Sequence, residues 1–117
     1  YDLYYTMSNY APESNVEQHK IFDYFLNDWD LEYIKSVSPA DMAAKMNGLK
    51  FKAVLFEGTA DITIGPGNAE TYRKALSKAG NENVELVIFE NVTHSIPKSY
   101  AADEMYLKTI ELFTTTL

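Results

Sequence analysis

The chain has 117 residues, of which 46% are hydrophobic and 23% charged, and its formal net charge is −7 at pH 7. This is the composition of one globular domain and excludes a disordered chain. The acidic balance excludes nucleic acid and anionic membrane surfaces as expected partners. Because the chain has no cysteine, it has no disulfide framework, no thiolate zinc site and no cysteine nucleophile.

The first part of the chain carries few structural signals. It begins with Tyr1 rather than methionine, so we expect a chain that has been processed or cut from a longer protein. A hydroxyl residue with a glutamate three positions later, Ser14 and Glu17, forms a capping box. This pattern predicts a helix that runs to about Asp28.

A second helix is predicted from a pair of boundary signals. Residues 31–37 are ambiguous and are interpreted as a short helical turn. Ser38 followed by Pro39 is typical of an N-cap with proline at the first helical position. Asn47-Gly48 tolerates the left-handed conformation that ends helices. These signals predict a short helix over Pro39–Met46.

Two strands and two helices are predicted in the remaining chain. Phe51–Glu57 and Val84–Glu90 each contain consecutive apolar residues, a pattern typical of parallel strands buried on both faces. Between them, Asn68–Ala79 has apolar residues at helical spacing and is followed by Gly80, a C-cap residue. The order strand, helix, strand predicts a right-handed crossover in a parallel sheet. A closing helix is predicted over about Lys98–Thr114.

The predicted fold class is therefore α/β, with a partial parallel sheet and flanking helices. Two strands alone make a poor independent sheet. We expect a further strand either from Leu3–Met7 or from chain outside this sequence.

The residues that follow each predicted strand are the candidates for function, because open parallel sheets carry their sites at the carboxyl ends of the strands. Asp61 follows the first strand, and His94 follows the second. A carboxylate beside a histidine fixes the ring's tautomer and stabilises the imidazolium that forms when the ring takes a proton. The pair therefore predicts a general base held by an acid.

Three segments, LFEGTAD, KALSKAG and VELVIFENVTH, resemble the last third of an α/β-hydrolase. The sequence is most similar to the dienelactone hydrolase, esterase and prolyl-oligopeptidase-like branch. The resemblance covers about residues 38–113 and is weak over 1–37, so residues 1–117 are interpreted as a single, incomplete C-terminal segment of that fold. It implies that Asp61 is the triad acid and His94 the triad base, acting on a small-molecule ester or amide without a cofactor or a metal.

The nucleophile of such a triad has no match in this sequence. In the family it precedes the acid, on a Gly-x-Ser-x-Gly turn, and no serine here is centred between two glycines. Ser95 is discounted, because neighbouring residues rarely point at one another productively. We expect the serine to come from sequence absent here, and this chain alone to be inactive. The expected partner is the missing N-terminal part of the fold, or a self-association partner.

Two alternatives remain open at this point. The chain is instead a non-catalytic, hydrolase-derived binding or assembly module if the pair has lost its geometry. It is a small free-standing α/β domain if Asp61 and His94 follow the two strands only by chance.

Overall fold

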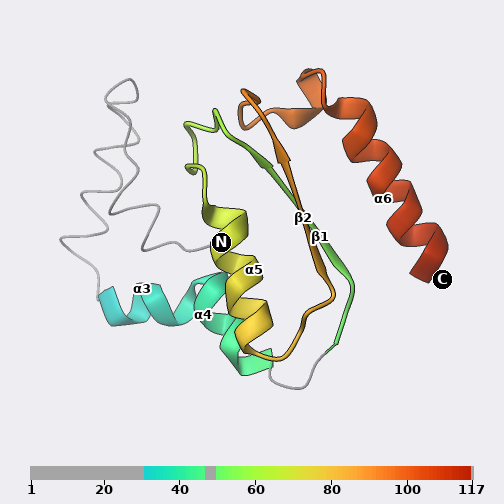
Figure 1. Ribbon diagram of the computed structural model, residues 1–117. Coiled ribbons are helices and arrows are strands. Elements are labelled where there is room, and N and C mark those ends of the chain that lie inside the picture. The colour runs from blue at the N-terminus through green and yellow to red at the C-terminus, as the bar shows by residue number, and fades with distance from the viewer. Residues whose placement is uncertain (1–30, 47–49, 117) are drawn as a thin grey trace.

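The computed structural model describes residues 31–46 and 50–116. The elements follow one another as shown in Figure 1: α3 (Leu31–Val37), α4 (Pro39–Ala43), the 3-10 turn η1 (Ala44–Met46), β1 (Ala53–Gly58), α5 (Asn68–Lys78), β2 (Val84–Phe89), the 3-10 turn η2 (Ile96–Lys98) and α6 (Ala102–Thr116). The predicted helix from Ser14 and the candidate strand Leu3–Met7 lie outside the described residues.

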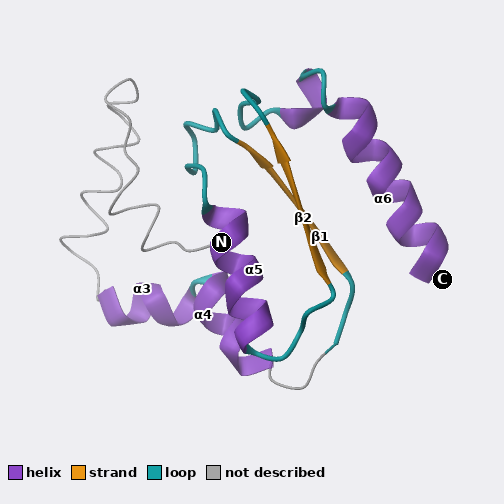
Figure 2. Cartoon of the chain, viewed as in Figure 1, coloured by secondary structure: helices purple, strands orange, loops and turns teal. Residues whose placement is uncertain are grey.

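The sheet consists of β1 and β2, which run parallel with Ala53 opposite Val84 and Gly58 opposite Phe89. Helix α5 connects the two strands, as the order of the predicted elements required. Figure 2 shows this arrangement of a small sheet with helices beside it. The predicted fold class, a partial parallel sheet with flanking helices, is therefore confirmed.

Helices α5 and α6 lie on opposite sides of the sheet (Figure 1). Ala69 and Leu76 of α5 are buried, with 3% and 0% of their surface exposed. The other side holds a hydrophobic cluster built on buried Phe89, Val92 and Ala101, with partly buried side chains from β1, β2, η2 and α6 against it. In this cluster the ring of Phe56 stacks on that of Phe89 with the centroids 6.1 Å apart, so both strands contribute to one core.

An ion pair also joins α6 to the sheet. The ammonium group of Lys108 donates a hydrogen bond to the carboxylate of Glu85 on β2. This contact raises the pKa of Lys108 above its ordinary value, because the bonded carboxylate stabilises the charged form.

The expectation that the strands are buried on both faces is wrong for part of the sheet. Ile88 of β2 is 52% exposed. The outer side of α6 likewise exposes Leu107, Ile110 and Phe113. The described residues contain only two strands, so no third strand or further helix covers these side chains within them.

The predicted helix boundaries agree with the structure to within a few residues. Ser38 adopts the extended conformation of an N-cap, but its side chain makes no capping hydrogen bond. Instead its carbonyl oxygen accepts the N–H of Met42 at 2.9 Å. The helix predicted to reach Met46 tightens into a 3-10 turn from Ala44. Gly80 has the positive φ, 92°, that its C-cap position requires.

Gly58, the last residue of β1, packs against the backbone of the loop that follows β2. A Cβ atom at this position would lie 2.1 Å from the carbonyl oxygen of Val92. That oxygen is fixed, because it accepts the N–H of Ala60 at 3.0 Å. We expect Gly58→Ala to lower the free energy of unfolding by about 3 kcal/mol, since backbone must shift to make room. Thermal unfolding followed by circular dichroism measures the change.

Gly80→Ala is the matched comparison for this substitution. A Cβ atom at Gly80 meets nothing within 4 Å, although φ is 92°. This variant should cost only about 1 kcal/mol, the cost of placing alanine in the left-handed region. If Gly58→Ala melts at or above the temperature of Gly80→Ala, the close approach at Gly58 is not a constraint on the fold.

Candidate active site

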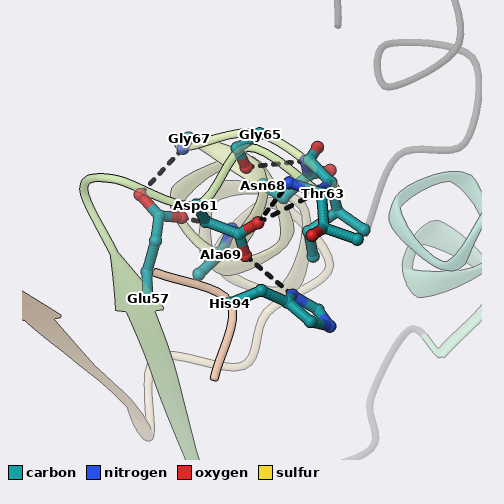
Figure 3. A network of polar contacts seen from close by, with 9 residues as sticks. Glu57, Asp61, Thr63, Gly65, Gly67, Asn68, Ala69 and His94 are labelled. Carbon is teal, nitrogen blue, oxygen red and sulfur yellow. Dashed lines mark hydrogen bonds and ion pairs between the residues drawn. The ribbon is translucent and has the colours of Figure 1, made fainter. Parts of the chain in front are cut away.

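The loops that follow β1 and β2 are held together by hydrogen bonds. The N–H of Thr59 donates to the carbonyl of Phe89 at 3.0 Å. The hydroxyl oxygen of Thr59 accepts the N–H of Asn91 at 2.8 Å. Asn91 itself has a φ of 56°, a left-handed conformation that asparagine tolerates. These contacts bring Asp61 and His94 to the same edge of the sheet (Figure 3).

The two residues predicted as acid and base are in direct contact. Nδ1 of His94 lies 2.9 Å from Oδ2 of Asp61. An ionised carboxylate has only acceptors, so Nδ1 is the nitrogen that carries the hydrogen in this contact. In the neutral ring Nε2 then keeps a lone pair, and Figure 3 shows this nitrogen pointing away from Asp61. The arrangement leaves Nε2 able to take a proton from a hydroxyl group.

The side chains of Asp61 and His94 differ in their exposure to solvent. The side chain of Asp61 is 10% exposed, whereas that of His94 is 53% exposed. The acid is therefore shielded from water, while the ring can meet a reacting group. A positive charge that forms on the imidazole is stabilised by the adjacent carboxylate of Asp61, because opposite charges this close attract each other.

The second oxygen of Asp61 is fixed by the backbone. Oδ1 accepts the N–H groups of Thr63 at 2.8 Å and Ile64 at 3.1 Å. With Oδ2 on His94, both oxygens have partners, so the carboxylate has one defined orientation. The turn after β1 thus places the acid and fixes the direction in which its carboxylate points.

Two further polar residues belong to the same network and were not singled out from the sequence. The carboxylate of Glu57 accepts the N–H of Gly67 at 2.7 Å and that of Ala69 at 2.9 Å. The amide of Asn68, which is 1% exposed, donates to the carbonyls of Ile64 at 2.6 Å and Gly65 at 3.1 Å. The sequence signal for Glu57 was an acid at the end of a strand that a loop connects to a helix, because the free N–H groups at the start of a helix attract carboxylates.

A cavity of about 80 Å³ lies beside the pair. Its wall combines apolar side chains with the polar groups of the site and includes Phe56, Glu57, Asp61, Ile64, His94 and Ile96. Within residues 31–46 and 50–116, no group of three or more histidine, aspartate or glutamate side chains is arranged to hold a metal ion. In the same part of the chain, no helix has the length and apolar character needed to cross a membrane.

The sequence pattern of the prolyl oligopeptidase family matches residues 1–117. No curated protein and no solved structure matches the chain. The match extends the resemblance over the weakly similar first 37 residues and confirms the α/β-hydrolase origin of the fold. The chain belongs to the prolyl oligopeptidase family and is thus related to serine hydrolases of the α/β-hydrolase fold.

Proposed function

We propose that Asp61 and His94 are the acid and the base of a Ser-His-Asp triad that cleaves ester or amide bonds. The observation that carries this proposal is the 2.9 Å contact between His94 Nδ1 and Asp61 Oδ2. It joins two residues 33 positions apart in the chain, at the strand ends where open parallel sheets carry their sites.

In this proposal each group has a step. Nε2 of His94 accepts the proton of a serine hydroxyl as the serine oxygen bonds to the substrate's carbonyl carbon. Asp61 stabilises the imidazolium that results. The imidazolium then gives its proton to the departing alcohol or amine, which leaves an acyl-serine. Water, deprotonated by the same nitrogen, releases the acid and restores the serine.

The nucleophile of this scheme lies on sequence other than these 117 residues, which contain no Gly-x-Ser-x-Gly turn. The structure gives no support to Ser95 in that role. Ser95 is exposed, and within the described chain no hydrogen bond links its hydroxyl to His94.

A non-catalytic binding module is the competing function. The exposed apolar side chains of α6, Leu107, Ile110 and Phe113, favour it because large apolar surfaces mark interaction sites. The Asp61–His94 geometry argues against it, since a module that no longer catalyses has no need for a buried acid aligned on a histidine.

Labelling with a fluorophosphonate, which reacts covalently with activated serines, separates the two functions. The full native polypeptide should take up one label per chain, and mass spectrometry should place it on one serine outside these 117 residues. A heat-denatured sample is the control and should stay unlabelled. Hydrolysis of a p-nitrophenyl ester and of a peptide p-nitroanilide then tells ester from amide substrates. A native protein that takes no label and cleaves neither substrate is a binding module, not a hydrolase.

A further inference from the structure

The acid of the proposed triad lies in a loop that has no regular secondary structure. This loop runs from the end of β1 to the start of α5, and Asp61 lies near its beginning. Its two glycines, Gly65 and Gly67, have φ values of 87° and 93°. Glycine adopts many conformations at little cost, so the loop needs other contacts to hold a single path.

Glu57 supplies a contact that spans the whole loop. It lies on β1, before the loop begins, while its two oxygens accept N–H groups from Gly67 and Ala69, where the loop ends. The partners are 10 and 12 residues away in the chain. The two carboxylate oxygens of Glu57 therefore lie at the N-terminus of α5, where a negative charge is favourable. Glu57 thus closes the loop at its base (Figure 3).

Asn68 connects this closure to the acid. It lies between the two residues that Glu57 binds, and its amide donates to the carbonyls of Ile64 and Gly65. The N–H of Ile64 in turn donates to Oδ1 of Asp61 at 3.1 Å. Hydrogen bonds, joined by the backbone of residues 67–69 and of Ile64, therefore connect Glu57 through the start of α5 to Asp61.

We propose that Glu57 is a positioning residue of the triad, an inference that rests on the proposed function. Its carboxylate holds the start of α5 and, through Asn68, the loop that aims Asp61 at Nδ1 of His94. Glu57 does not touch the reacting atoms. Its contribution is to keep the acid within the narrow range of positions at which it orients the ring.

Glu57→Gln tests this role with almost no change in shape. The glutamine oxygen still accepts one of the two N–H groups that Glu57 binds. Its amide nitrogen is a donor, so the other N–H group loses its acceptor. In the full native polypeptide, kcat per active site should fall about 30-fold while KM stays within about twofold, because a small displacement of a catalytic group costs rate rather than binding. Active sites are counted from the fluorophosphonate label, so unfolded protein does not enter kcat.

Glu90→Gln is the matched control. It makes the same chemical change at the end of the neighbouring strand, in an exposed side chain outside the network. Its kcat should stay within about twofold of the unmodified protein, because exposed substitutions away from the site have small effects. Glu57→Ala, which removes both acceptors, should lose more kcat than Glu57→Gln.

Proton NMR of the His94 ring provides a readout that general destabilisation does not move. The Nδ1–H resonance should be observable in the native polypeptide and in Glu90→Gln. It should broaden by exchange with water in Glu57→Gln, at a temperature where circular dichroism shows that variant to be folded. An unchanged kcat together with an unchanged resonance in Glu57→Gln would overturn the positioning role. His94→Ala, measured in parallel, keeps the two claims apart, because its full activity would instead refute the proposed triad.

Discussion

His94→Ala should abolish turnover in the full native polypeptide, with kcat/KM lower by about a million-fold. Without the imidazole no group takes the serine's proton and none returns it to the leaving group, so both halves of the reaction lose their proton carrier. The effect is a chemical one, because the side chain of His94 is half exposed and lies outside the hydrophobic cluster. Initial rates with a p-nitrophenyl ester measure it.

Ser95→Ala is the control for this prediction, since it changes the adjacent exposed residue. Its kcat/KM should stay within about twofold of the unmodified protein. A His94→Ala protein that retains activity comparable with the Ser95→Ala protein would mean that another group is the base.

Asp61→Asn should lower kcat by about ten-thousand-fold. The amide oxygen can take the place of Oδ1 and keep the hydrogen bonds from Thr63 and Ile64, so the loop retains its shape. The amide nitrogen then faces Nδ1 of His94 as a donor. The ring accordingly adopts the other tautomer, with its hydrogen on Nε2, and can no longer act as a base.

The stability of the Asp61→Asn protein separates this effect from misfolding. Its melting temperature should remain within a few degrees of the unmodified protein, whereas kcat falls. Asp103→Asn, an exposed change at the start of α6, should alter neither quantity. A kcat within tenfold of the unmodified value for Asp61→Asn would show that the carboxylate does not set the tautomer.

Much of this fold and the positions of Asp61 and His94 follow from local sequence patterns. Apolar runs located both strands, and helical spacing between Asn68 and Ala79 located α5 to within one residue of its observed end. Asp61 and His94 were found because they follow those strands, and parallel strands end at a common edge. Short-range periodicity was therefore sufficient to predict the elements whose structure is determined by residues close together in the sequence.

Other features depend on contacts between distant residues and left little trace in the sequence. The proposed role of Glu57 depends on the path of the loop that brings Gly67, ten positions further along the chain, back to it. The exposure of Ile88 depends on what lies beside β2 in space, which the apolar run over Val84–Phe89 does not reveal. The helix cap at Ser38 is a similar case, since a serine at this position allows a capping hydrogen bond from its side chain without requiring it.

The loops around the site also connect the stability of the fold with the geometry of the proposed triad. Gly58 allows the loop after β2 to approach β1, and the hydrogen bond between Ala60 and Val92 forms at that approach. Because Asp61 follows Ala60 directly and His94 comes soon after Val92, a shift here displaces both members of the pair. The Gly58→Ala protein should therefore lose activity at temperatures at which it is still folded.

The most direct test of the account is a crystal structure of the full native polypeptide after reaction with a fluorophosphonate. We predict that the phosphonylated serine oxygen lies within about 3.2 Å of His94 Nε2, while Nδ1 keeps its hydrogen bond to Asp61. An adduct on a serine next to a different histidine, or with His94 and Asp61 far from the phosphorus, would contradict the assignment of these two residues as the acid and base of the proposed triad.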